Sequence, residues 1–159
     1  MGRPMIEHIL KLAEALKKHK VRYLFIGKGA AILYGYPGTT QDIDVFPQKS
    51  EANSRNLVKA LKEVGFKLDQ TLEQAILQAK DFIQIRGGPF PLDLVFAPDG
   101  INSFEEADKN KRIVDGKFLC ASIDDIIKSK QAAKRSRDKE ELPRLMAFRD
   151  ELRKKGPGS

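Results

Sequence analysis

The chain has 159 residues, of which 41% are hydrophobic and 32% charged, and its formal net charge is +7. This composition is typical of a globular protein, and the length predicts one domain over residues 1–155 with a flexible tail at 156–159. No apolar run approaches the roughly 20 residues that cross a membrane, and the first 20 residues favour an amphipathic helix over a signal peptide. The single Cys120 excludes an internal disulfide. We therefore expect a cytoplasmic protein without membrane contact.

Hydrophobic spacing and turn residues predict helices and strands along the whole chain. In chain order, the predicted elements are a helix over 4–19, a strand over 21–26, a short helix over 30–33, a strand over 41–46, a helix over 50–65, strands over 82–85 and 92–96, short edge strands over 112–114 and 118–120, a helix from 122 to about 137 and a last helix to 152. Together they predict an α/β (α+β) fold, a small mixed β-sheet with flanking helices and a helical C-terminal part over about 122–155.

Two acids one residue apart form the most informative motif. Asp42 and Asp44 in TTQDIDVF would lie on one face of the predicted strand, about 6 to 7 Å apart, because alternate strand residues point to the same side. Just upstream, Gly27, Lys28 and Gly29 open a short helix, and a helix N-terminus is suited to phosphate. The motif therefore predicts half of a divalent-metal site beside a phosphate site.

A third acid, Asp93, interrupts the apolar run PLDLVF, where burial of an unpaired carboxylate is costly. If its strand neighbours that of Asp42 and Asp44, three carboxylates converge, each pair repelling by roughly 3 kcal/mol at about 5 Å unless a cation or a raised pKa compensates. All-oxygen ligands favour Mg²⁺ or Mn²⁺. The alternative is that Asp42 caps a turn and that Asp93 is satisfied by a backbone or lysine partner.

The run GKGAAILYG, the turn after it, TTQDIDVF and LDLVF together resemble the polymerase-β-type nucleotidyltransferase superfamily. The resemblance covers about residues 21–96 and is closest to small stand-alone members related to abortive-infection-system toxins. The Lys- and Arg-rich helix that begins near Ser122 also resembles a helix of that family. The resemblance implies a nucleotidyltransferase-like fold and the transfer of a nucleoside monophosphate from an NTP, such as ATP, to an acceptor.

The same resemblance implies roles for individual residues. Asp42 and Asp44 would hold metal ions that bridge the triphosphate, and Asp93 would complete the metal site and help to activate the acceptor hydroxyl. The positions expected to bind the nucleotide are Gly27, Lys28, Gly29, Thr40 and Lys130. The acceptor could be RNA or tRNA, a protein or a small molecule, and the basic C-terminal helices favour nucleic acid slightly.

Lys130 falls near the middle of an apolar helical stripe formed by Ile123, Ile126, Ile127 and Ala133. A lysine at such a position either extends to the edge of the apolar surface or points at a negative group. The carboxylate cluster or bound phosphates would provide such a group.

Two positions depart from the family pattern. Lys28 stands where the family usually has a second Gly or a Ser, and Gly38 stands where many relatives have Arg. Lys28 could add charge to a phosphate site, or it could fill and block that site. The second hypothesis is therefore a catalytically degenerate nucleotide- or RNA-binding module, and half of a toxin–antitoxin pair is compatible with either chemistry. Apolar residues near Phe104 and Met146, expected to be exposed, leave dimerisation open.

Overall fold

The computed structural model describes residues 2–133 and 136–155, so the predicted tail at 156–159 lies outside the described residues. The helices are α1 (Arg3–Lys18), α2 (Gly27–Leu33), α3 (Glu51–Val64), α4 (Gln70–Leu77), α5 (Phe104–Lys109), α6 (Ile123–Ala133) and α7 (Ser136–Lys154). The strands are β1 (Tyr23–Ile26), β2 (Ile43–Pro47), β3 (Phe82–Ile85), β4 (Leu92–Val95), β5 (Arg112–Val114) and β6 (Phe118–Cys120). None of the described helices is long and apolar enough to cross a membrane.

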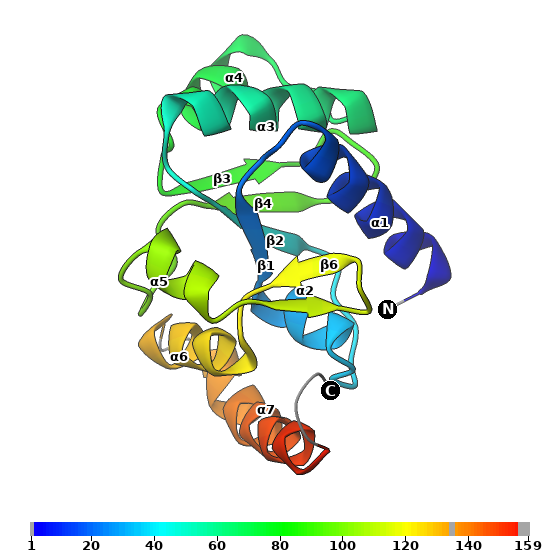
Figure 1. Ribbon diagram of the computed structural model, residues 1–159, viewed down its shortest axis with the longest axis vertical. Coiled ribbons are helices and arrows are strands. Elements are labelled where there is room, and N and C mark those ends of the chain that lie inside the picture. The colour runs from blue at the N-terminus through cyan, green and yellow to red at the C-terminus, as the bar shows by residue number, and fades with distance from the viewer. Residues whose placement is uncertain (1, 134–135, 156–159) are drawn as a thin grey trace.

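The strands form one mixed sheet in the order β3-β4-β2-β1-β6-β5, with helices packed around it (Figure 1). The pairs β2/β4 and β1/β6 are parallel, and the other neighbouring pairs are antiparallel. The predicted class, a small mixed sheet with flanking helices, is confirmed. One detail is wrong: β6 is not an edge strand, because it lies between β1 and β5.

Side-chain caps begin α3 and α6, two of the helices that the sequence predicted. The hydroxyl of Ser50 accepts a hydrogen bond from the Asn53 amide at the start of α3, and that of Ser122 accepts one from the Asp125 amide at the start of α6 at 3.0 Å. Such caps satisfy backbone N–H groups that have no partner within the helix.

Two short helices, α4 and α5, were not predicted. Each begins in the same way, with Asp69 accepting from the Leu72 amide and Ser103 accepting from the Glu106 amide. Their lengths of eight and six residues give too few turns for a clear hydrophobic period. The capping residues Asp69 and Ser103 were the sequence signal available for these two helices.

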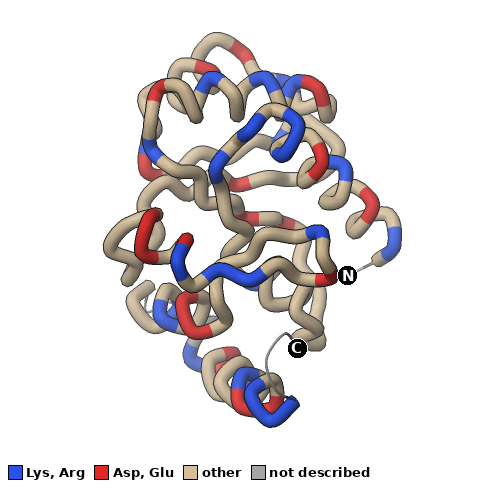
Figure 2. The backbone as a smooth tube through the Cα atoms, in the orientation of Figure 1, with Lys and Arg blue, Asp and Glu red and all other residues tan. Residues whose placement is uncertain are grey.

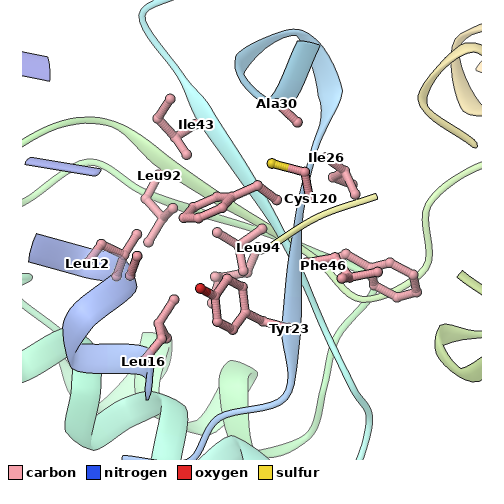
Figure 3. Close-up of a cluster of buried hydrophobic side chains, with 14 of the residues drawn as sticks. Leu12, Leu16, Tyr23, Ile26, Ala30, Ile43, Phe46, Leu92, Leu94 and Cys120 are labelled. Carbon is pink, nitrogen blue, oxygen red and sulfur yellow. The ribbon is translucent and has the colours of Figure 1, made fainter. Parts of the chain in front are cut away.

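The sheet has one densely packed face. It carries Ile43 and Val45 of β2 and Leu92 and Leu94 of β4, and all four side chains are buried. Figure 3 shows Leu12 and Leu16 of α1 reaching the same cluster. Alternation along β2 and β4 places Asp44 and Asp93 on the opposite face.

Phe104 is buried rather than exposed as predicted, with 6% of its surface accessible. Its ring packs edge-on against Phe46 at 5.3 Å, and the Arg22 guanidinium lies 5.2 Å from its centre. Met146 is partly buried against the core. The aromatic contact beneath α5 explains the error, because no helix was expected there to place Phe104 inward.

Candidate active site

The strand pairing brings the acids of the two motifs together. β2 and β4 are parallel neighbours, and Asp44 lies directly opposite Asp93 in their register. Asp42 immediately precedes β2, which begins at Ile43 and not at Gln41 as predicted. The two strands are therefore neighbours, as the metal-site hypothesis requires, while the roles of the three acids as metal ligands and catalytic groups stay predictions.

The acidic cluster contains an internal cation. Nη1 of Arg86 donates a hydrogen bond to Oδ1 of Asp93 at 3.2 Å and lies 3.8 Å from Oδ1 of Asp42. Burial raises the pKa of Asp93, the negative charge of Asp42 raises it further, and the guanidinium of Arg86 opposes both effects. A partner of Asp93 is thus an arginine, whereas the alternative to a metal site predicted a backbone or lysine partner.

Arg86 could have been found from strand register. Gln84 pairs with Asp93 across β3 and β4, and Arg86 follows Gln84 by two residues. Two residues along a strand return to the same face. The long side chain of Arg86 therefore projects from the face that carries the acids.

Gly27 allows Asp44 to approach the backbone closely. Its φ is +73°, and a Cβ built there would collide with Oδ2 of Asp44. A side chain at residue 27 would thus be strained by the backbone conformation and would displace the carboxylate. The glycine that opens α2 is required by the position of an acid as well as by the turn.

Gly29 and Thr40 have different surroundings. A Cβ at the buried Gly29 would lie 3.1 Å from Cδ1 of Ile43, so this glycine permits close packing of α2 on β2. The hydroxyl of Thr40 donates to the carbonyl oxygen of Asp42 at 3.0 Å and fixes the loop before β2. Gly27, Lys28 and Thr40 line the cleft described next, whereas Gly29 is not among its lining residues. Their binding roles stay predictions.

A cleft of about 600 Å³ opens over the acidic face of the sheet. Asp42, Asp44 and Asp93 line it together with residues of α6 and α7. This volume falls within the range of small-molecule sites. In Figure 2 the acidic positions of the sheet lie on its central strands, while basic positions lie mostly on peripheral helices and loops.

Two lysines that line the cleft contact one glutamate of α7. Nζ of Lys28 lies 3.3 Å from Oε1 of Glu141, and Nζ of Lys130 lies 3.7 Å from Oε2 of the same carboxylate. Lys28 therefore extends toward α7 and does not enter the acidic cluster. Lys130 is 16% exposed, and one negative group that it faces is Glu141.

The position of α7 determines where Glu141 lies. The ring of Phe148 packs edge-on against Tyr36 at 5.6 Å, and Arg153 donates to both carboxylate oxygens of Asp124 on α6. These contacts join α7 to α6 and to the turn after α2. Glu141 was missed because it stands in the charged run KEEL, where no pattern distinguishes it from solvent-exposed neighbours.

The donor chemistry of the acidic cluster suits a hard divalent cation, since it consists of carboxylate oxygens. The three carboxylates line one cleft, where their negative charges would attract a divalent cation. Within residues 2–133 and 136–155, no group of three His, Cys, Asp or Glu side chains is already arranged as a metal site. The acids fit a metal ion because their oxygens are suitable ligands and their strands are neighbours. Binding would require some movement of their side chains.

Comparisons with known proteins identify the fold. No protein-family model matches the chain, and no curated protein matches it. The solved structures that it resembles include TM1012 of Thermotoga maritima, to which nucleotidyltransferase activity is ascribed. The TM-score is 0.59 at 19% sequence identity, and the match covers 94% of this chain and 97% of that one. Another is the antibiotic-resistance factor ANT(2'')-Ia, with a TM-score of 0.63, 15% identity and coverage of 98% and 94%. The chain therefore has a nucleotidyltransferase-like fold.

Proposed function

We propose that this protein is a metal-dependent nucleotidyltransferase that transfers a nucleoside monophosphate from an NTP to the hydroxyl of an acceptor. One observation carries the proposal. Asp44 and Asp93 lie opposite each other on adjacent parallel strands, with Asp42 just before the first of them, in a cleft of a nucleotidyltransferase-like fold that Gly27 also lines. A relation to abortive-infection toxins remains part of the proposal.

The acids would hold Mg²⁺ or Mn²⁺, which would neutralise the triphosphate and position it for in-line displacement. Asp44, held against Gly27, and Asp42 would face the triphosphate. Lys28 and Lys130, which also line the cleft, supply ammonium groups that favour anionic phosphates. Glu141 contacts both ammonium groups and thereby restricts where they lie.

In the proposed reaction, the acceptor oxygen forms a bond to the α-phosphorus of the NTP while the bond to the pyrophosphate leaving group breaks. The acceptor hydroxyl loses its proton to Asp93. Burial raises the pKa of Asp93, which makes its ionised form a stronger base than an ordinary aspartate. The products are the nucleotidylated acceptor and pyrophosphate.

A second candidate is a catalytically degenerate nucleotide- or RNA-binding module of the same fold. Its support is the pairing of Arg86 with Asp42 and Asp93, because an internal cation could take the place of the metal. Binding of NTP or RNA without release of pyrophosphate would favour this function. Membership of a toxin–antitoxin pair is compatible with both candidates, and a neighbouring antitoxin gene would support it.

Incubation of the protein with α-labelled NTPs, Mg²⁺ or Mn²⁺, and either total RNA, protein extract or small-molecule acceptors tests the proposal. We expect metal-dependent labelling of one acceptor class and release of pyrophosphate, both lost in Asp42→Ala and Asp44→Ala. Asp115→Asn provides a matched control, because Asp115 is an exposed acid in the turn between β5 and β6. Equal transfer by the parent and the two alanine variants would refute the mechanism.

A further inference from the structure

The cleft is acidic, although the chain as a whole is basic. Besides the three proposed metal ligands, four acids line it: Asp81, Asp99, Asp125 and Glu141. Among the described residues 2–133 and 136–155, two lysines line it, whereas the net charge of the chain is +7. A cleft lined mainly by one sign of charge concentrates ligands of the opposite sign. The cleft is therefore suited to a cationic ligand.

Three of these acids, Asp81, Asp99 and Asp125, form a second acid set, and packing joins the segments that carry them. The carbonyl oxygen of Asp81 accepts a hydrogen bond from the backbone amide of Phe96 at 2.9 Å, just before the loop that contains Asp99. A Cβ built at Gly100 would lie 2.8 Å from the nearest side-chain atom of α6, so the same loop packs against the helix of Asp125. The second acid set thus belongs to adjoining segments that line one cleft.

The second acid set has little positive charge against it. Oδ1 of Asp81 lies 3.8 Å from Nζ of Lys49, but both side chains are more than half exposed, so solvent weakens this pair. Asp99 is exposed and forms no ion pair with any described residue. Oδ2 of Asp125 is buried and has no hydrogen-bond partner among the described residues. Buried polar atoms are normally hydrogen-bonded, so a donor supplied by a ligand would stabilise this carboxylate.

The basic residues of the cleft do not balance these acids. Glu141 contacts both Lys28 and Lys130, with N–O distances of 3.3 and 3.7 Å. In the proposed reaction, divalent cations offset the charge of the triphosphate. The second acid set would therefore stay negative when the NTP and its metal ions are bound, and its charge would act on the acceptor.

We propose that the acceptor is a small hydroxyl-bearing polycation, such as an oligosaccharide of amino sugars, whose ammonium groups bind Asp81, Asp99 and Asp125. Ammonium groups donate charge-assisted hydrogen bonds to carboxylates. A sugar hydroxyl would bond to the α-phosphorus and lose its proton to Asp93, and pyrophosphate would leave. This inference rests on the proposed function for the transfer step, whereas binding of the polycation does not depend on catalysis.

The charges of the cleft argue against an RNA acceptor. The second acid set would repel each phosphodiester that enters. The basic positions that give the chain its charge of +7 lie mostly on peripheral helices and loops (Figure 2). The charge of the whole chain therefore differs in sign from that of the surface that the acceptor would meet.

Isothermal titration calorimetry of the whole chain with the trisaccharide of glucosamine tests the proposal, in saturating Mg²⁺, with and without a non-transferable NTP analogue. The measurement is made at mildly acidic pH, where amines are protonated. The fully N-acetylated trisaccharide is the control ligand, because it lacks the ammonium charges and keeps the ring hydroxyls. We expect the charged trisaccharide to bind about tenfold more tightly than the N-acetylated one.

Two variants assign the binding to the second acid set. Asp99→Asn should weaken binding of the charged trisaccharide about threefold, and Asp99→Asn combined with Asp125→Asn about tenfold. Asp115→Asn is the matched control and should bind as the parent does, because Asp115 is an exposed acid that does not line the cleft.

Equal binding of the two trisaccharides, or binding of neither, would overturn the proposal. So would equal losses in Asp99→Asn and Asp115→Asn, or displacement of the charged trisaccharide by single-stranded RNA. Nucleotide transfer to RNA or protein without binding of the trisaccharide would refute this acceptor and leave the proposed enzyme standing. Binding of the trisaccharide without any nucleotide transfer would refute the proposed enzyme but not the polycation site.

Discussion

The two faces of the sheet differ in charge and burial, although the same strands build both. On β4, Leu92 and Leu94 are fully buried in the core, while Asp93 between them faces the cleft and contacts Arg86. On β2, Val45 is likewise buried, and Asp44 lies against Gly27. Adjacent residues on one strand thus lie in two different environments, one apolar and buried and the other charged and facing the cleft.

Strand alternation, rather than distance, separates the residues that stabilise the fold from those of the proposed site. The packed face contributes hydrophobic stabilisation, whereas the cleft face retains charges whose mutual repulsion opposes folding. Substitutions one residue apart should therefore have opposite consequences.

The largest effect on stability is expected from Leu94→Ala on the packed face. Removing a fully buried leucine side chain should lower the free energy of unfolding by about 3 kcal/mol, as measured by urea denaturation with an unchanged m-value. Val95→Ala is the matched control on the same strand, since Val95 is partly exposed on the cleft face, and it should cost about 1 kcal/mol or less. Similar losses for both variants would contradict the separation of the faces.

Gly27→Ala tests how closely the cleft face depends on its backbone. An alanine at φ +73° should destabilise the fold by about 1 to 2 kcal/mol, and its Cβ should push Asp44 aside, lowering transfer activity about 100-fold. Gly116→Ala has a similar φ of +68° but nothing within 4 Å of the new Cβ, so it should lose stability without losing activity. Unfolding curves and initial rates measured on both variants separate the two effects.

The main features of the fold follow from the sequence because they depend on local patterns. Apolar residues at helical spacing specify the long helices, apolar runs specify most strands, and α3 begins at Glu51, directly after its Ser50 cap. The short helix α5 was missed, and Phe104 was consequently placed on the surface. Local patterns cannot show which short polar segment will cover an aromatic contact such as that of Phe104 with Phe46.

The site was predictable only where its residues are close in sequence or interrupt a pattern. Asp93 was recognisable as an acid within an apolar strand, and its juxtaposition with Asp44 required only that the strands be neighbours. Glu141 and Lys28 are 113 residues apart, and their meeting depends on how α7 docks on α6. Docking is determined by tertiary contacts such as those of Arg153 with Asp124, for which the sequence holds no periodic signal.

Asp93→Asn should reveal the cost of keeping a charge on the cleft face. Because burial raises the pKa of Asp93 above its ordinary 3.8, the folded state binds the proton more tightly than the unfolded state. The parent is then stabilised by protonation below pH 3.8 and loses that stabilisation as pH rises through the raised pKa. The Tm of Asp93→Asn relative to the parent should therefore increase from acid to neutral pH, in metal-free buffer. A difference that stays constant or falls with rising pH would contradict the raised pKa.

The smallest effect that we predict concerns the internal cation of the cleft face. Arg86 neutralises part of the charge on Asp42 and Asp93, so it competes with a metal for the same oxygens. Arg86→Gln should raise the affinity for Mn²⁺ several-fold, measured by calorimetry without nucleotide, because the acids then lack their resident positive charge. Arg55→Gln removes the same charge from an exposed pair with Glu51 on α3 and should leave Mn²⁺ affinity unchanged. If Arg86→Gln instead weakens Mn²⁺ binding, the arginine positions the carboxylates for the metal rather than competing with it, and the acidic face is then preorganised by its own cation.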